Sequence, residues 1–310
     1  MKILITGSNG LLGQKLVYKL RNTTGVECIA TARGVNRLVQ QEGYIYDSLD
    51  ITNKKNVEDV FSKYLPDVII NTAAMTNVDA CETEKETSWL MNATAVEFQV
   101  KTLEALQKKN PNYKPHFIHL STDFIFDGTH GPLDEEEKPN PLSYYAEGKL
   151  EAEKIVKAST LHWAIARTVL VYGIVDNMSR SNIVLWVKSN LEQGKVINVV
   201  DDQFRTPTLA EDLADGCILI AQKRAKGVYN ISGKNFYSIL ELATVVADYY
   251  GLDKSLIKPS KSADIKQPAK RPPITGFIID KAVNNLGYNP HSFTEGIKLL
   301  EDQIKAMGKA

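Results

Sequence analysis

The sequence predicts an α/β protein with a doubly wound parallel sheet and a smaller C-terminal α/β lobe. Short apolar runs rich in Ile and Val alternate with longer segments of helical period, which is typical of a parallel sheet covered on both faces. A glycine-rich turn directly follows the first apolar run. After about residue 170 the alternation loosens and Pro becomes more frequent, which indicates the second lobe.

The individual elements follow from this alternation. Strands are expected at residues 2–5, 27–31, 43–46, 67–71, 116–120 and 163–166, and helices between them at 11–20, 56–64, 86–108 and 143–157. Right-handed crossovers between parallel strands leave few topologies other than a doubly wound sheet. In the C-terminal lobe we expect helices at 210–221 and 238–250, the second with a Ser238/Glu241 capping box, and a loop over the proline-rich stretch 259–273. The acidic stretch 131–139 is expected to be a solvated, mobile cover.

Composition and charge argue against several classes of partner. The 310 residues include 37 Lys plus Arg and 37 Asp plus Glu, so no net charge attracts nucleic acid or an anionic membrane. Cys28, Cys81 and Cys217 are far apart and suit neither a disulfide framework nor a metal site. The first apolar run is too short for a signal peptide, and no apolar window is long enough to span a membrane. We therefore expect a cytoplasmic protein without a bound metal.

The glycine-rich turn has the sequence TGSNGLLG and predicts a dinucleotide site. Its first glycine permits a tight strand-to-helix turn, the second lets the backbone approach a pyrophosphate, and the third lets helix and strand pack closely. The pyrophosphate then lies at the helix N-terminus, where free N–H groups favour negative charge. The residues expected to contact the cofactor here are Gly7, Asn9, Gly10, Leu11, Leu12 and Gly13.

The glycine spacing, G-x-x-G-x-x-G, resembles that of the extended short-chain dehydrogenase/reductases. The second strand ends in IATARG, without a carboxylate to accept the ribose hydroxyls of NAD. Arg33 instead suits the ribose phosphate of NADP, so NADPH is the favoured cofactor and NADH the alternative. Asp50 and Ile51, after the third strand, are expected at the adenine, and the small residues Ala73 and Ala74, after the fourth strand, at a cofactor ribose.

Tyr145 and Lys149 are the candidate catalytic pair of a reductase. Because they are spaced i, i+4, they share one helix face, and the ammonium is expected to lie near the phenol and lower its pKa toward the working pH. Tyr145 would then protonate a substrate carbonyl. Tyr250 and Lys254 have the same spacing, but Gly251 is expected to end their helix.

Hydroxyl groups are expected at the same edge of the sheet, because the fifth strand ends in Ser121, Thr122 and Asp123. Ligands of open α/β sheets bind outside the carboxyl ends of the strands. Thr122 or Ser121 is therefore expected to hydrogen-bond the substrate carbonyl and polarise it. A turn or a helix cap is the alternative role of this cluster.

The stretches TGSNGLLG, NTAAMTNVDACE, STDFIFDG, NPLSYYAEGKLEAE and VVDDQFRTPTLAEDLA together resemble the dTDP-4-dehydrorhamnose reductase family. The resemblance implies a Rossmann-like NAD(P)-binding domain over residues 1–170 and a substrate-binding lobe over 171–310, with parts of the chain crossing back to the sheet. It implies that Tyr145 donates the proton, that Lys149 is its partner and that Thr122 polarises the sugar carbonyl. The implied reaction is hydride transfer from the nicotinamide to C4 of dTDP-4-dehydro-6-deoxy-L-mannose, which gives dTDP-L-rhamnose.

The resemblance also places Val78, Asp123 and Gln203 in the site for the nucleotide-sugar substrate. Arg205 stands where the family usually has a small residue. Arg205 and Arg271 are each expected either to contact a substrate phosphate or to be surface or packing residues. A homodimer is a further expectation, although the spacing of the carboxylates supports no metal ligand set.

Two other kinds of function stay open. A 4-epimerase or 4,6-dehydratase on the same scaffold would cycle hydride internally, but Asp123 is followed by Phe124 and not by the Glu that dehydratases use. A non-catalytic nucleotide-binding subunit, like the reductase-like subunit of methionine adenosyltransferase, resembles reductases in the same stretches. The intact set of Tyr145, Lys149 and Thr122 favours an enzyme.

Overall fold

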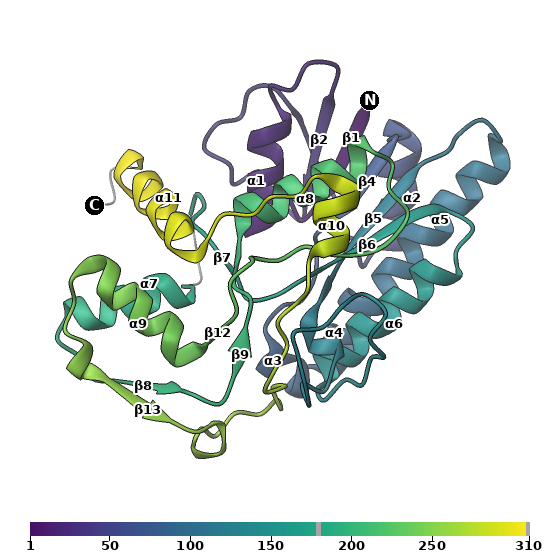
Figure 1. The fold of residues 1–310 in the computed structure, drawn as a ribbon. Helices are drawn as coiled ribbons and strands as arrows, with labels where there is room; N and C mark the ends of the chain where they lie inside the picture. The colour runs from purple at the N-terminus through teal and green to yellow at the C-terminus, as the bar shows by residue number, and fades with distance from the viewer. Residues whose placement is uncertain (178–180, 308–310) are drawn as a thin grey trace.

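A seven-stranded parallel sheet forms the centre of the computed structural model, which describes residues 1–177 and 181–307 (Figure 1). The strand order is β11-β6-β5-β4-β1-β2-β3, and every neighbouring pair is parallel. The strands are β1 (Lys2–Thr6), β2 (Glu27–Ala32), β3 (Ile45–Ser48), β4 (Val68–Asn71), β5 (His116–Thr122), β6 (His162–Thr168) and β11 (Gly227–Asn230). The predicted fold class is confirmed.

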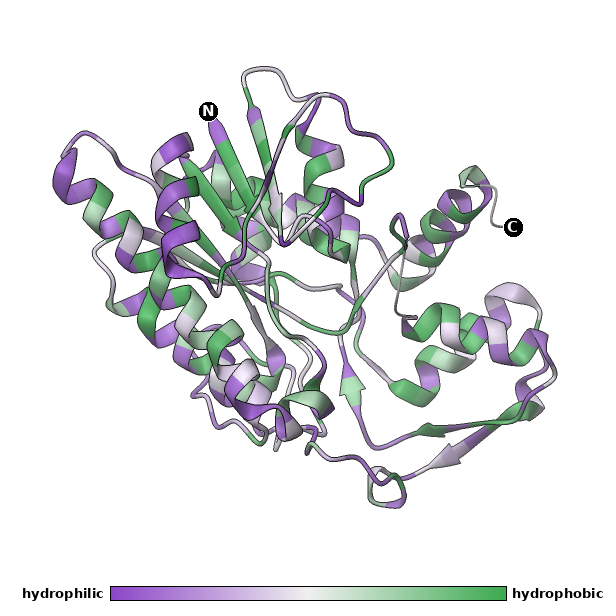
Figure 2. Cartoon of the chain, turned by 180° about the vertical axis from the view of Figure 1, so that it is seen from behind, coloured by the Kyte–Doolittle hydropathy of each residue, from purple (hydrophilic) through white to green (hydrophobic). Residues whose placement is uncertain are grey.

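Helices cover both faces of the sheet, because successive side chains of each buried strand point to opposite faces. In β1, Ile3 and Ile5 pack with one set of helices and Leu4 packs with the other. The first set is α1 (Leu11–Leu20), α8 (Ala210–Gln222) and α10 (Asp280–Leu286), and the second is α2 (Lys54–Tyr64), α5 (Ala95–Lys109) and α6 (Tyr144–Ala158). Figure 2 shows the central strands as largely hydrophobic and the surrounding helices as mixed.

The helix predicted over residues 86–108 is interrupted by a π-helical turn. The segment consists of α4 (Lys85–Trp89), the π turn (Leu90–Thr94) and α5. From the π turn, the Asn92 side chain accepts a hydrogen bond from Met75 N at 2.9 Å and donates one to Met75 O at 3.0 Å. The turn therefore fixes the loop that follows β4. π turns of this kind are frequent at functional sites.

The smaller lobe is built from α7 (Ile183–Glu192), α9 (Ile239–Tyr250) and α11 (Phe293–Ala306), which share a core with β8 (Ile197–Val200) and β13 (Ile257–Ser260) (Figure 1). The loop predicted over 259–273 is wrong at its start, because Pro259 lies in β13 and pairs in parallel with Val199. In this two-stranded sheet both strands are edges, where Pro is tolerated. The predicted Ser238/Glu241 capping box is confirmed. The remaining strand pairs are β7 (Val171–Tyr172) with β10 (Thr208–Leu209) and β9 (Phe204–Arg205) with β12 (Tyr237–Ser238).

The chain leaves the sheet after β6 and later returns to it. Helix α8 packs on α1, and β11 pairs with β6 as the seventh strand of the sheet. Residues 210–230 thus share the core of the sheet although they follow residue 170. The division of the chain into domains at that residue, and the assignment of residues 171–310 to substrate binding, stay predictions.

The acidic stretch 131–139 agrees only in part with the expected solvated, mobile cover: Asp134, Glu136 and Lys138 are exposed, but the stretch is held to the rest of the chain at two points. Leu133 is buried, its N–H donates to Gly276 O at 2.7 Å, and its carbonyl accepts from Ile278 N at 2.8 Å. The Glu135 carboxylate accepts from the backbone N–H of Asn230 in β11 at 2.9 Å. One buried apolar residue and one half-buried carboxylate within the charged run attach it to the rest of the protein.

A buried ion pair joins α6 to β6. Arg167 donates Nε and Nη2 to the two carboxylate oxygens of Glu153, each at 2.9 Å, and both residues are at most 1% exposed. Burial alone would raise the pKa of Glu153, but the hydrogen bonds and charge of Arg167 outweigh it and lower this pKa to about 2. The pair therefore contributes stability above the ordinary pKa of 4.5, and the contribution is lost as the pH falls toward 2.

We expect Arg167→Met to lower the free energy of unfolding by roughly 3–5 kcal/mol at neutral pH, because it leaves a buried carboxylate without its main partner. Urea denaturation followed by circular dichroism measures this loss. The matched control is Lys154→Met, which breaks the exposed Lys154–Glu151 pair on the same helix and should cost less than about 1 kcal/mol. Equal small losses in both variants would contradict the role of the buried pair.

Candidate active site

A cavity of about 1090 Å³ lies at the carboxyl ends of the central strands, where the sheet meets the smaller lobe. Every site residue predicted from the sequence lines it. The expected cofactor residues there are Gly7, Asn9, Gly10, Leu11, Leu12, Gly13, Arg33, Asp50, Ile51, Ala73 and Ala74; the others are Val78, Thr122, Asp123, Tyr145, Lys149, Gln203, Arg205 and Arg271. The structure thus brings together residues from the ends of the five strands β1 to β5, from three helices and from the smaller lobe. Their individual roles stay predictions.

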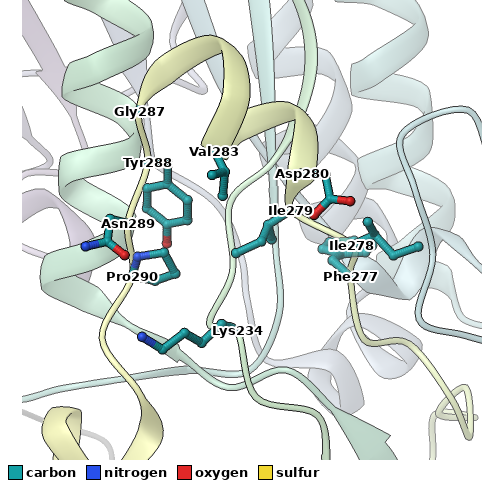
Figure 3. Close-up of a pocket in the computed structure, with 10 residues that line it drawn as sticks. All are labelled: Lys234, Phe277, Ile278, Ile279, Asp280, Val283, Gly287, Tyr288, Asn289 and Pro290. Carbon is teal, nitrogen blue, oxygen red and sulfur yellow. The ribbon is translucent and has the colours of Figure 1, made fainter.

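A second cavity, of about 540 Å³, lies between α10 and residues 287–290 (Figure 3). Phe277, Ile278, Ile279 and Val283 form the apolar part of its wall. Figure 3 shows its two charged residues, Lys234 and Asp280, at different ends of the cavity. None of the predicted site residues lies there.

The glycine-rich turn has the geometry that a pyrophosphate site requires. Gly7 has φ +70°, a conformation that favours glycine. A Cβ on Gly13 would lie 2.3 Å from Gly7 O, so only glycine lets α1 approach the turn this closely. Gly10 is the N-cap of α1 and provides no side-chain acceptor, so the first N–H groups of α1 face the cavity without a side-chain cap.

Two arginines lie beside the outer end of the turn. Arg33 and Arg37 both line the cavity and are exposed, and neither guanidinium pairs with another residue of the described parts of the chain. Asn9 accepts from Arg37 N and donates to Val35 O, both at 2.9 Å, so it holds their loop against the glycine turn. Asp50 accepts two hydrogen bonds from Thr52 and shapes the next loop. The sequence pattern did not indicate Arg37, because this residue lies five positions beyond the end of β2 at Ala32.

Tyr145 and Lys149 lie one turn apart on the buried face of α6. The Thr122 hydroxyl is within hydrogen-bonding reach of the Tyr145 hydroxyl. Lys149 Nζ donates to Leu120 O at 2.5 Å and lies 3.3 Å from His119 Nε2. Helix α6 therefore brings the phenol, the amine and the Thr122 hydroxyl to one point of the cavity.

The expectation that Lys149 lowers the pKa of Tyr145 is wrong for this structure. Burial raises the pKa of Tyr145 above its ordinary value of 10, and the Thr122 hydrogen bond opposes this only in part. Burial also lowers the pKa of Lys149 to about 8, with Glu153 opposing the shift. The phenol is therefore protonated at neutral pH, and the amine titrates near the physiological range.

Asp123 sits in a buried polar cluster between the sheet and the smaller lobe. Its carboxylate accepts from Thr122 Oγ1 at 3.0 Å and from the Thr275 hydroxyl, and Arg205 Nε lies 3.8 Å away. Burial raises the pKa of Asp123, and the charge of Arg205 opposes this increase. Thr275 was not predicted, because only the folded chain brings the C-terminal segment to β5.

The two candidate anion-binding arginines already have protein partners. Arg205 is 3% exposed, and its two Nη groups donate to the carbonyls of Phe204, Pro272 and Pro273 and to the Gln203 side chain. It therefore holds the segment before Thr275 against β9, which agrees with the packing alternative. Arg271 pairs with Asp79 of α3 (Val78–Thr83), with distances of 2.7 and 3.1 Å.

The described parts of the chain contain neither a membrane-spanning helix nor a cluster of metal ligands. In residues 1–177 and 181–307, every helix is too short or too polar to span a bilayer. Over the same residues, no group of three or more His, Cys, Asp or Glu is placed to hold a metal ion. The three cysteines are buried thiols without a disulfide.

Comparison with known proteins agrees with this architecture. The sequence matches the RmlD substrate binding domain family over residues 1–306. The chain belongs to this family. The crystal structure of a dTDP-4-dehydrorhamnose reductase from Clostridium acetobutylicum has the same fold as this RmlD family chain, with a TM-score of 0.83. The two sequences are 28% identical, and the match covers 98% of this chain and 100% of the reductase.

Two proteins with similar sequences have names that indicate different roles. A probable low-salt glycan biosynthesis reductase of Haloferax volcanii is 28% identical over 307 residues, which cover 97% of each chain. The methionine adenosyltransferase 2 subunit beta of Bos taurus is 30% identical over 266 residues, 83% of this chain and 75% of that protein. The RmlD family chain is thus similar both to a reductase and to a subunit named for a different enzyme.

We expect Gly13→Ala to weaken NADPH binding roughly tenfold or more, because the added Cβ would force α1 away from the turn that we expect to hold a pyrophosphate. Fluorescence titration with NADPH measures the affinity. Gly216→Ala is the control: its Cβ would lie 2.4 Å from Ile231 Cγ2, so it disturbs α8 but not the turn. Wild-type affinity in Gly13→Ala would contradict the assignment of the turn.

Proposed function

We propose that this RmlD family chain catalyses the NAD(P)H-dependent reduction of the 4-keto group of a nucleotide-linked deoxysugar. The observation that carries the proposal is that Tyr145, Lys149 and Thr122 converge in the same cavity as the glycine-rich turn. The substrate that we propose is dTDP-4-dehydro-6-deoxy-L-mannose, and the product dTDP-L-rhamnose. The similarity to the Clostridium acetobutylicum reductase over nearly the whole of both chains supports this choice.

The residues have complementary roles in this proposal. A bound nicotinamide would supply the hydride to the carbonyl carbon. Tyr145 gives its proton to the carbonyl oxygen. Thr122 turns its hydroxyl proton from Asp123 to donate a hydrogen bond to the same oxygen as negative charge develops there. The Lys149 ammonium then returns a proton to the tyrosinate. The raised pKa of Tyr145 keeps its proton in place until the oxygen becomes basic, and the pKa of about 8 of Lys149 suits a group that passes a proton on near neutral pH.

NADPH is the cofactor that we propose, with NADH as the alternative. The adenosine ribose of a dinucleotide on the glycine turn would lie near the ends of β2 and β3. Arg33 and Arg37 offer guanidinium groups there that no residue of 1–177 or 181–307 pairs with, and guanidinium groups suit a ribose phosphate. We further propose that the protein works in the cytoplasm on a nucleotide sugar. The homodimer stays a prediction.

The alternatives predict different behaviour of the same cavity. An epimerase or dehydratase would return its hydride to the sugar. Asp123 is followed by Phe124 and not by the Glu that such an elimination would need. A regulatory subunit would bind NADPH without turnover. The similarity to the methionine adenosyltransferase subunit favours that second candidate, whereas the complete set of Tyr145, Lys149 and Thr122 favours the reductase.

We expect wild-type protein to oxidise NADPH when given the dTDP-linked 4-keto-6-deoxy sugar. Tyr145→Phe should lower the rate roughly 10²–10⁴-fold, because it removes the proton donor, and should still bind NADPH. Absorbance of NADPH follows the reaction. Tyr144→Phe removes the neighbouring phenol, whose ring packs on Trp89, and should keep the rate. Turnover by Tyr145→Phe at the wild-type rate would show that Tyr145 is not the acid.

Arg33→Ala and Arg37→Ala test the cofactor proposal. Each variant should lose roughly tenfold in affinity for NADPH and little for NADH, because only NADPH carries the ribose phosphate. Titration of both dinucleotides gives the ratio of affinities, and Lys154→Ala, which removes a positive charge from the exposed side of α6, is the control. An unchanged ratio in both arginine variants would refute the assignment.

A further inference from the structure

A continuous chain of four buried polar side chains connects the glycine-rich turn to Lys149. Thr6 ends β1, Asn71 ends β4, His119 lies in β5, and Lys149 lies on α6. Thr6 Oγ1 lies 2.6 Å from Asn71 Oδ1, Asn71 Nδ2 lies 3.0 Å from His119 Nδ1, and His119 Nε2 lies 3.3 Å from Lys149 Nζ. Thr6 is fully buried, and Asn71, His119 and Lys149 are 1%, 1% and 4% exposed.

The direction of the hydrogen bonds follows from the first member of this chain. The backbone N–H of Ala73 donates to Thr6 Oγ1 at 3.3 Å, and the Thr6 hydroxyl donates its own proton to Asn71 Oδ1. The amide nitrogen of Asn71, which can only donate, then faces His119 Nδ1. His119 Nδ1 must therefore offer a lone pair, and the neutral imidazole carries its proton on Nε2.

The protonated Nε2 faces the amine of Lys149. An N–H can donate to a neutral amine, whereas an ammonium has three donors and no acceptor, so the two groups would then oppose each other. The reverse order of hydrogen bonds fails at Thr6. If the Asn71 amide were turned round, Thr6 Oγ1 would accept from both Ala73 and Asn71, and its proton would find no acceptor among the described residues.

We propose that His119 is a positioning residue that turns its Nε2–H toward Lys149 and thereby favours the neutral amine over the ammonium. The proposal rests on the proposed function, in which Lys149 returns a proton to Tyr145. A lysine that faces only acceptors would hold its proton too firmly for this transfer. His119 makes the transfer easier without touching the substrate or the cofactor.

The charged and titratable neighbours of Lys149 are compatible with this role. On α6, Glu153 favours the ammonium, but its carboxylate is already shared with Arg167 of β6. Tyr145, on the same helix, is protonated at neutral pH, and Asp123 after β5 and Cys81 of α3 act on Tyr145. Burial and the charge of Lys149 hold the pKa of His119 well below its usual value. His119 therefore stays neutral throughout the range in which Lys149 titrates.

The tautomer of His119 tests the proposal without any activity. NMR of protein labelled with ¹⁵N-histidine distinguishes a protonated from an unprotonated ring nitrogen, and His119→Gln identifies the signals that belong to His119. At neutral pH we expect Nε2 to be protonated and Nδ1 unprotonated. A proton on Nδ1 with a bare Nε2, or an imidazolium with both, would overturn the proposal.

The pH dependence of turnover tests the effect on Lys149. The reductase needs the ammonium, so the wild-type kcat should fall as the pH rises through about 8. In His119→Gln the side-chain oxygen can turn toward Lys149 and accept from it, so we expect this basic limb to move about one pH unit higher, a tenfold change in the proton affinity of Lys149. An unshifted limb, or a shift to lower pH, would overturn the proposal.

His116→Gln is the matched control, because His116 is fully buried in the same strand and its ring lies against His162, away from Lys149. It should leave the pH profile in place even if it costs stability. The same shift in both variants would assign the effect to loss of packing and overturn the proposal. Wild-type protein without turnover would contradict the proposed function, and the tautomer of His119 would still decide this proposal.

Discussion

The burial of the Lys149 amine is the constraint on which the rest of the site depends. An amine removed from water must find hydrogen-bond partners within the protein. Here the Leu120 carbonyl and the His119 ring, both from β5, surround it. Tyr145, Lys149 and Glu153 follow at intervals of four on the buried face of α6, and Glu153 pairs with Arg167 of β6. The row of residues that fixes α6 on the sheet therefore also contains Tyr145, the proposed proton donor.

A second buried cluster positions the smaller lobe over this edge of the sheet. Arg205 of β9 donates to the carbonyls of Pro272 and Pro273, and the following segment brings the Thr275 hydroxyl to Asp123 after β5. One wall of the cavity is formed by the sheet and has the features of a dinucleotide site. The other wall is formed by the smaller lobe, which these hydrogen bonds hold against the sheet. Because the tie passes through Asp123, next to Thr122, the position of the lobe and the geometry of the reacting groups depend on each other.

The sequence was sufficient for those features that local pattern determines. Six strands, the glycine-rich turn and the spacing of Tyr145 and Lys149 can be read from apolar periodicity and motif alone. The seventh strand, β11, could not be recognised, because it is short and follows the change in pattern after residue 170. Only its pairing with β6 identifies it as a strand of the sheet. The π turn that points Asn92 at Met75 was equally hidden, since it interrupts a continuous helical pattern.

Electrostatic details were the least predictable part of the site. His119 looked like an ordinary strand residue, and only the order of β4 beside β5 places Asn71 against it. The spacing of Tyr145 and Lys149 suggested a lowered pKa for Tyr145, but the fold buries the phenol and directs the amine toward β5, so this pKa is raised. Likewise the sequence left Arg205 open between an anion-binding and a packing role, and the carbonyls of the distant residues Pro272 and Pro273, which accept from its Nη groups, agree with the packing role.

The most direct test of the central claim follows the hydride itself. NADPH with deuterium at both hydrogen positions of nicotinamide C4, mixed with the dTDP-linked 4-keto-6-deoxy sugar, should give a product with deuterium at the sugar C4, detected by mass spectrometry and NMR. We expect one deuterium in the sugar for each NADPH oxidised. A sugar product without deuterium, or a sugar that changes without net oxidation of NADPH, would contradict the proposed hydride transfer.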